Sequence, residues 1–135
     1  MDMKTLTLSR RAALLGGLAL VSTAQLVQAD TAKLNVVATT GMIADAARRV
    51  GGDLVTFKAL MGAGVDPHAY RQTRSDIVAL TRADLVLWHG LYLEAQMEDF
   101  FADLSGKTRV VAAAEALPKD DLLSHEDYAG RYDPH

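Results

Sequence analysis

The chain has 135 residues, of which 50% are hydrophobic and 23% are charged, and it contains no cysteine. Its formal net charge of −3 at pH 7 disfavours nucleic acid as a partner, because that ligand calls for a basic surface. Without cysteine the sequence has neither a disulfide framework nor a residue for lipid attachment.

Residues 1–29 are typical of an export signal. Three basic residues precede an apolar run over residues 12–27, and the stretch closes on Val27-Gln28-Ala29, which suits cleavage by signal peptidase. A membrane anchor is the less favoured alternative, because the uncharged run is short and is broken by Gly16 and Gly17. We therefore expect a signal peptide over residues 1–29 and a product, residues 30–135, in the periplasm.

The paired Arg10 and Arg11 also fit a twin-arginine signal, but Ala13 stands where that motif has phenylalanine, so Sec export is favoured. Residues 1–29 carry three of the 14 basic residues and one of the 17 acidic residues. Residues 30–135 therefore keep 11 and 16, a net charge of −5. Such an acidic product is compatible with attracting cations, and its length permits one domain with a modest core.

Short β-rich runs alternate with helical ones after residue 33. Strands are expected at residues 34–38, 54–60, 84–88 and 109–111. Between them, helices are expected at three places: residues 42–50, residues 73–82 after a capping box that begins at Thr73, and residues 91–104. Strands separated by helices predict an α/β fold with a four-stranded parallel sheet and flanking helices.

Helical spacing also predicts which faces of two helices are buried. In the first helix the spaced residues are Ile43, Ala46, Ala47 and Val50, and Gly51-Gly52 stops the helix. In the third they are Leu93, Met97, Phe100 and Leu104. Trp88 and the Phe100-Phe101 pair are expected to pack in the core rather than to hold a cofactor.

Parallel strands all end at one edge of the sheet, where open α/β sheets bind ligands. Four segments should therefore meet at one rim: residues 39–41, 64–68, 89–90 and 113–115. His135 joins them only if residues 117–132 fold back across that rim.

The stretch Gly62-Ala-Gly-Val-Asp-Pro-His-Ala-Tyr70 presents an imidazole on a stiff stem. Its glycines allow a turn, Pro67 fixes its own φ angle, and Asp66 before it is biased toward extended geometry. His68 held in this way suits a metal ion. Asp133-Pro134-His135 repeats the Asp-Pro-His step, which suggests two ligands.

These blocks resemble the zinc- and manganese-binding solute receptors of ABC importers, over residues 33–135. The segments that carry the resemblance are residues 39–45, 60–70 and 90–94, and the Gly-Val-Asp-Pro-His-Ala-Tyr block is specific. In that family the metal lies between two lobes and takes four protein ligands. The resemblance implies that His68 and His135 are the first two, and that residues 30–135 are the N-terminal metal-binding lobe, with the second lobe absent from this sequence.

The resemblance also implies a function. The exported protein would capture Zn²⁺ or Mn²⁺ and deliver it to an ABC permease in the inner membrane, as a monomer and without catalysis. The choice between the two metals depends on carboxylate ligands that this chain lacks. One alternative is a truncated product or fragment with weak, poorly selective metal binding. A metal-dependent hydrolase is less favoured, because the sequence has neither an H-E-x-x-H motif nor a Ser-His-Asp arrangement.

Three further places have polar residues that fit more than one role. His89, after the third strand, is expected to have a hydrogen-bonded structural role. Glu94 fits either an acceptor that orients a ligating histidine or a glutamate that serves a helix start. His125, Glu126 and Asp127 are interpreted as a solvated loop, with metal capture as the alternative.

Overall fold

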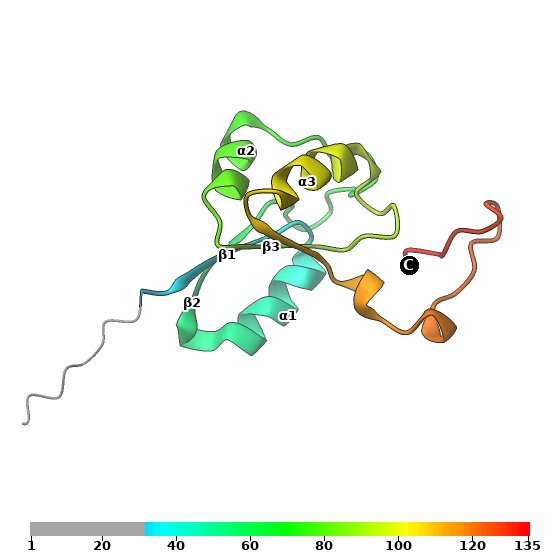
Figure 1. Ribbon diagram of the computed structural model, residues 1–135, viewed down its shortest axis with the longest axis horizontal. Coiled ribbons are helices and arrows are strands. Elements are labelled where there is room, and N and C mark those ends of the chain that lie inside the picture. Colours follow the sequence, from blue (N-terminus) through cyan, green and yellow to red (C-terminus); the bar gives the residue numbers. More distant parts are fainter. Residues whose placement is uncertain (1–31) are drawn as a thin grey trace, which may run out of the picture. The chain divides into compact units, whose positions relative to one another are not determined.

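Four parallel strands form the centre of the fold, in the order β2-β1-β3-β4 (Figure 1). In the computed structural model, which describes residues 32–135, they are β1 (Leu34–Ala38), β2 (Val55–Ala59), β3 (Leu85–Trp88) and β4 (Arg109–Ala112). Every pairing is parallel. The predicted α/β class and four-stranded parallel sheet are therefore confirmed, with strand ends within a residue or two of their expected positions.

The expected signal peptide, residues 1–29, lies outside the described residues. Within residues 32–135, none of the helices has the length and apolar character that a membrane crossing requires.

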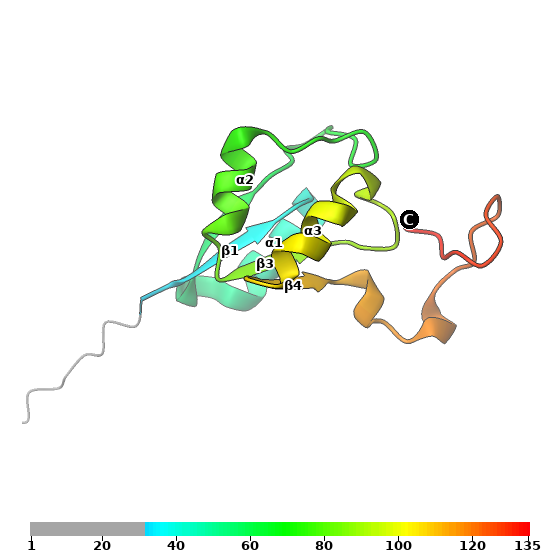
Figure 2. The ribbon, with the colours of Figure 1, turned by 45° about the horizontal axis from the view of Figure 1, so that its top comes forward.

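Three α-helices cover the two faces of the sheet (Figures 1 and 2). Helix α1 (Gly41–Gly51) lies on one face, and α2 (Arg74–Thr81) and α3 (Glu98–Ser105) lie on the other. Four short 3-10 turns complete the described elements, at Gly52–Leu54, Ala95–Met97, Ala114–Ala116 and Lys119–Asp121. This arrangement leaves the carboxyl ends of all four strands at one edge.

The main core lies between the sheet and the pair α2 and α3. Its buried side chains come from two strands, two helices and the segments beside them: Val37, Met61, Leu80, Ala83, Val86, Met97, Phe101 and Leu104. Full burial of one such large side chain stabilises the fold by roughly 1.5–3 kcal/mol. Trp88 and Phe100 pack against this cluster, in agreement with their predicted core role.

The prediction of which residues of α1 are buried is partly wrong. Ala44 is the buried residue of this helix, whereas Ala46 is exposed and Val50 is 90% exposed. The guanidinium of Arg48 lies 5.5 Å from the ring centroid of Phe57 in β2. In the last turn of α1, Arg48 rather than Val50 thus lies against the sheet.

The third helix begins later than the sequence pattern predicts. Residues 91–94 form a turn, and α3 starts only at Glu98. Gly90, Leu91 and Tyr92 all have positive φ angles, of 86°, 53° and 68°, which no right-handed helix contains. Leu93, Met97 and Leu104 are buried as expected, but the fully buried aromatic residue is Phe101 rather than Phe100.

Candidate metal site

His68 lies on a loop that leaves the carboxyl end of β2. The N–H of Met61 still donates to the Thr39 carbonyl at 2.9 Å, after which the chain turns through Gly64 with φ 78°. Asp66 Oδ1 then accepts the backbone N–H of His68 at 2.9 Å. The expected stem is therefore a local aspartate turn, and it leaves the His68 side chain exposed at the rim.

A buried carboxylate ties this loop to the start of α2. Asp76 Oδ2 accepts the Tyr70 hydroxyl at 2.7 Å, and also the backbone N–H and the hydroxyl of Thr73 at 2.9 and 2.7 Å. Burial alone would raise the pKa of Asp76, but these hydrogen bonds and the nearby Lys58 ammonium outweigh it and hold that pKa below its usual value. Burial and the Asp76 carboxylate together raise the pKa of Tyr70 to about 12. The sequence showed the capping box but gave no sign of the Tyr70 contact.

His135 reaches the rim through a short hairpin, residues 123–133, which we call the C-terminal hairpin. Ser124 and Tyr132 form an antiparallel bridge, the N–H of His125 donates to the Arg131 carbonyl, and the N–H of Asp133 donates to the Leu123 carbonyl. The chain is thereby turned back toward the sheet. The hairpin thus gives the chain the fold-back within residues 117–132 that His135 needs to reach the rim.

The second Asp-Pro-His step repeats the local geometry of the first. Asp133 Oδ1 accepts the backbone N–H of His135 at 2.9 Å and also lies 3.0 Å from Nδ1 of its ring. The backbone hydrogen bond, followed by the ring contact, lowers the pKa of the Asp133 carboxyl. A carboxylate at Nδ1 favours the tautomer whose proton is on Nδ1, which leaves the lone pair of Nε2 free for a metal ion. Sequence reasoning missed this role of Asp133, although the repeated motif was a signal for it.

The two imidazoles meet although 67 positions separate them in the sequence. Their Nε2 atoms are 3.2 Å apart, with ring centroids at 5.3 Å and planes tilted by 50°. Two nitrogens bound to one tetrahedral zinc ion at 2.0–2.1 Å would be about 3.3 Å apart, so the spacing fits such an ion. Residues 32–135 hold no cluster of three or more histidines or carboxylates with metal-binding geometry. The described site therefore offers two nitrogen ligands.

Glu94 is buried at this edge of the sheet, where β1 and β3 end. It is 0% exposed, and its Oε1 accepts the Thr39 hydroxyl at 2.6 Å and the His89 N–H at 2.9 Å, while Oε2 accepts the Gly90 N–H at 3.3 Å. Glu94 does stand at the start of the 3-10 turn Ala95–Met97, but its side chain bonds neither that turn nor a histidine ring, so neither expected side-chain role is seen. The turn at Gly90, Leu91 and Tyr92 brings the carboxylate back beneath β1 and β3, and it links their ends.

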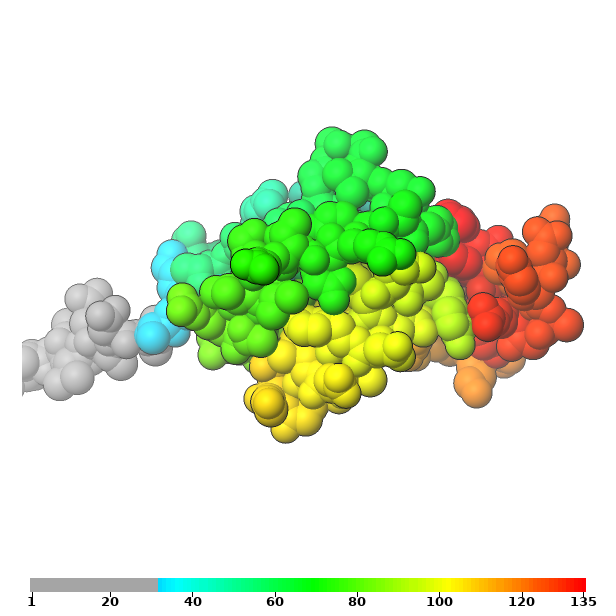
Figure 3. All heavy atoms as spheres, turned by 90° about the horizontal axis from the view of Figure 1, so that it is seen from above, coloured from blue at the N-terminus to red at the C-terminus, as the bar shows by residue number. Residues whose placement is uncertain are grey.

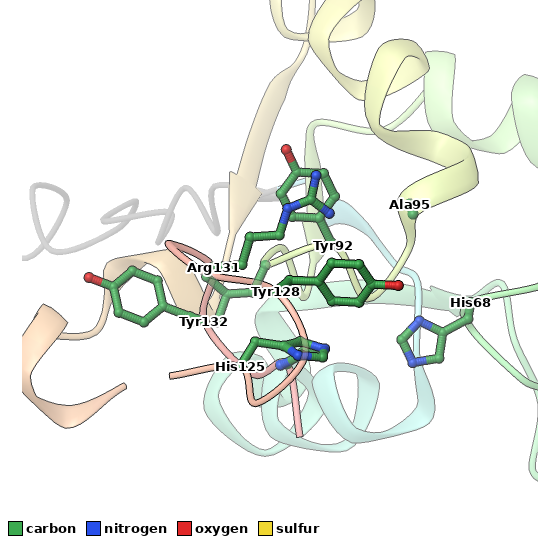
Figure 4. A pocket seen from close by; sticks show the side chains of 9 residues that line it. His68, Tyr92, Ala95, His125, Tyr128, Arg131 and Tyr132 are labelled. Atoms are coloured by element: carbon green, nitrogen blue, oxygen red, sulfur yellow. The ribbon is translucent and has the colours of Figure 1, made fainter. Parts of the chain in front are cut away.

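The other two histidines lie close to the pair. His89 lines a cavity of about 240 Å³ together with Asp133 and His135, and its backbone is hydrogen-bonded to Glu94 and Ala114. His125 lines a cavity of about 210 Å³ together with His68 (Figure 4). Nδ1 of His125 accepts the Asp127 N–H at 3.1 Å, and its ring packs edge-on against Tyr128. His125 is thus held within the C-terminal hairpin, beside exposed Glu126 and Asp127.

Residues far apart in the sequence also meet where this hairpin contacts the rim. In Figure 3 the red C-terminal segment lies beside the green and yellow-green segments of the rim. The Arg131 guanidinium lies 4.0 Å from the ring centroid of Tyr92 and 5.6 Å from that of Tyr128 (Figure 4). Arg131 and Tyr92 were missed from the sequence, because no local pattern relates residues 39 positions apart.

Comparison with known proteins gives the same family as the sequence motifs. A family model described as ZnuA, zinc-uptake complex component A, periplasmic, matches residues 36–135. The manganese-binding lipoprotein MntA of Bacillus subtilis is 44% identical over 103 residues, and the zinc-binding protein TroA of Treponema pallidum is 46% identical over 100 residues. These matches cover 76% and 74% of this chain.

Solved structures show the same architecture. The periplasmic zinc-binding protein TroA from Treponema pallidum superposes with a TM-score of 0.71 at 45% identity, over 76% of this chain and 36% of that one. A manganese-bound periplasmic metal-binding protein from Candidatus Liberibacter asiaticus gives a TM-score of 0.64 at 30% identity, over 76% and 38%. This chain spans about a third of the length of the curated relatives it matches, 33% for MntA and 32% for TroA.

Proposed function

This chain belongs to the ZnuA family of periplasmic zinc-uptake components, and from that membership we propose that it binds zinc(II) or manganese(II) as the cargo of an ABC importer. His68 and His135 are the proposed ligands. The observation that carries the proposal is the approach of their Nε2 atoms to 3.2 Å at the carboxyl edge of a parallel sheet.

In the proposed site both imidazoles bind the ion through neutral Nε2 atoms. Asp133 supports this chemistry, because its carboxylate at Nδ1 of His135 orients the ring and makes Nε2 a better donor. The glycine turn and Asp66 present His68 from the opposite side of the ion. Nothing in this scheme requires bond breaking, and we propose a receptor rather than an enzyme.

The relatives supply the setting that we propose for the whole protein. Residues 1–29 serve as a Sec signal peptide, residues 30–135 form an N-terminal metal-binding lobe in the periplasm, and the monomeric receptor hands its ion to a membrane permease. This sequence supplies two ligands, so in the isolated chain the other coordination positions go to water. We therefore expect binding that is weak and selects poorly between zinc and manganese.

Isothermal titration of the purified chain with zinc and with manganese tests the proposal. One ion per chain is expected. H68A and H135A should each weaken binding on the order of 100-fold, because loss of a ligand costs at least as much as loss of a residue that only hydrogen-bonds to a ligand. H125A is the matched control, because His125 lines the same cavity as His68 but is not a proposed ligand. It should change the Kd by less than roughly twofold.

Three results would contradict this proposal. Equal effects of H125A and H68A would show that the pair is not the site. A Kd of about 1 nM or below for the isolated chain would contradict the two-ligand account, since that affinity requires about −12 kcal/mol. Sustained hydrolysis of esters or phosphates by the metal-loaded chain would contradict the proposed receptor role.

A further inference from the structure

The C-terminal hairpin that carries His135 is held together almost entirely by its own hydrogen bonds. They join His125 to Arg131, Arg131 to Tyr128, and Asp133 to Leu123, and an antiparallel bridge joins Ser124 to Tyr132. These contacts fix the shape of the hairpin. They do not fix where it lies against the sheet.

Within residues 32–135, the hairpin and His135 have one contact of hydrogen-bond length with residues 32–117, and it is the approach of His135 to His68. That contact joins the two proposed ligands themselves, so it cannot position them before an ion binds. The salt bridges in the described part of the chain do not reach the body of the protein from the hairpin either.

Pro134, next to His135, is buried, and Arg131 supplies the remaining specific contact of the hairpin. Its guanidinium lies over the Tyr92 ring, 4.0 Å from the centroid, and Tyr128 of the same hairpin lies on its other flank at 5.6 Å. Figure 4 shows the guanidinium against Tyr92 at the wall of the cavity that His68 also lines. A planar guanidinium stacked on an aromatic ring is attracted by the ring quadrupole and fixes the relative orientation of the two groups.

The partner of Arg131 is itself held in an unusual backbone conformation. Tyr92 and Leu91 have φ angles of 68° and 53°, and non-glycine residues persist there only when their surroundings impose it. Glu94 accepts the N–H groups of His89 and Gly90, and Glu115 accepts the N–H of Leu91 at 3.4 Å. The strained turn is thus held mainly by Glu94, with a long, exposed hydrogen bond to Glu115, and it presents the Tyr92 ring outward to Arg131.

We propose that Arg131 is a positioning residue, which by stacking on Tyr92 holds the C-terminal hairpin so that His135 Nε2 faces His68 before the metal ion arrives. This inference rests on the proposed function, because it assigns a role to Arg131 only if the two histidines bind metal. It makes the second ligand part of a preorganised site. Loss of the stack would leave His135 on a hairpin that must be ordered at the expense of binding affinity.

The positive charge of Arg131 alone predicts the opposite effect on metal affinity. A cationic guanidinium beside the site repels a divalent ion, so an electrostatic effect alone would make removal of Arg131 strengthen binding. The direction of the change in Kd therefore separates a positioning role from a simple charge effect.

The test is zinc titration of the purified full chain and its R131A, R131K, Y92A and Y92F variants. R131A and Y92A should each weaken binding by roughly 3- to 30-fold, the range that cation–π contacts allow. Y92F keeps the ring and should bind like the unchanged chain, while R131K keeps the charge without the planar stack and should lie between. The double variant R131A/Y92A should be no weaker than its weaker parent, because the two residues act through one contact.

R48A is the matched control, because Arg48 also lies over an aromatic ring, that of Phe57, but in the last turn of α1 and away from the rim. It should leave the Kd unchanged. In an H135A background, R131A should have no further effect, which distinguishes positioning of His135 from general loss of structure. An amide NMR spectrum that is unchanged for residues 34–117 shows that the variants fold.

Different outcomes bear on zinc binding by the chain and on the positioning role of Arg131. Failure of the unchanged chain to bind zinc would overturn the proposed function. Zinc binding that R131A and Y92A leave unchanged or strengthen would overturn the positioning role alone. A further weakening by R131A in the H135A background would also overturn it.

Discussion

The two Asp-Pro-His steps of this chain are alike locally and different in how they are anchored. In both, an aspartate Oδ1 accepts the backbone N–H of the histidine two residues later at 2.9 Å. The His68 step, however, is tied to the core by the buried Asp76 network, whereas the His135 step follows a largely exposed hairpin and buries only its proline, Pro134. A short motif thus sets how an imidazole is presented, and tertiary contacts set how firmly it is placed.

The two aspartates also differ in what they reach. Asp133 contacts both the backbone and the ring of His135, while Asp66 contacts only the backbone N–H of His68. The less firmly anchored histidine is therefore the one whose ring is oriented by its own motif. Substitutions at the residues that hold each step test whether the two histidines differ in this way.

The largest effect on stability is expected at Glu94, which is buried where β1 and β3 end. Glu94→Ala leaves three donors, on buried Thr39 and Gly90 and on half-buried His89, without their acceptor, and should lower the free energy of unfolding by about 3 kcal/mol. Urea unfolding followed by circular dichroism measures this. Glu115→Ala is the control, because exposed Glu115 accepts one long hydrogen bond from Leu91, and it should change stability by less than about 0.5 kcal/mol.

Asp76→Ala should cause the second-largest loss of stability, and it should affect the His68 step but not the His135 step. It removes the acceptor of Tyr70 and Thr73, and a loss of about 2 kcal/mol is expected in the same unfolding measurement. Metal affinity should fall as well, because the loop that carries His68 loses its link to α2. Unchanged stability in Asp76→Ala would contradict the proposed anchoring of this step.

Asp76 also predicts a dependence of stability on pH. Because its pKa in the folded protein lies below the usual 3.8, its stabilising contribution is present above that value and is lost as the pH falls through the folded pKa. Thermal unfolding between pH 7 and pH 3 should therefore show a smaller acid-induced decrease in Tm for Asp76→Asn than for the unchanged chain. An equal decrease in both proteins would show that Asp76 does not contribute to acid sensitivity.

Asp133→Asn should have the smallest effect on folding but a clear one on metal binding. Loss of the carboxylate at Nδ1 of His135 is expected to weaken zinc binding by roughly tenfold, at the lower end of outer-shell effects because the group is partly exposed. Asp66→Asn is the matched change in the other step and should leave affinity within roughly twofold, since an amide oxygen can still accept the His68 N–H. Equal losses would remove the distinction between the two aspartates.

The regular part of this fold could be predicted from the sequence because it depends on local periodicity. Apolar runs located all four strands, and the capping box located the start of α2. The late start of α3 could not be predicted, because the turn at Leu91 and Tyr92 is held by Glu94, whose partner Thr39 is 55 positions away. Such a contact leaves no trace in a window of neighbouring residues.

The candidate site also has a part that could be predicted from the sequence and a part that could not. The chemistry of His68 and His135 was visible in two copies of one motif, and the position of His68 followed from the end of a strand. The approach of His135 depends on the C-terminal hairpin and on the stack of Arg131 on Tyr92, which only the three-dimensional structure brings together. That the pair binds metal remains a prediction.

Nitrogen NMR of the histidine rings tests the central claim most directly. The chain has four histidines, so each imidazole can be assigned and followed as zinc is added. Binding by the pair predicts that the Nε2 signals of His68 and His135 shift together and stop shifting at one equivalent, while His89 and His125 show much smaller changes. A shift confined to one of the pair, or larger shifts at His89 or His125, would contradict joint coordination by His68 and His135.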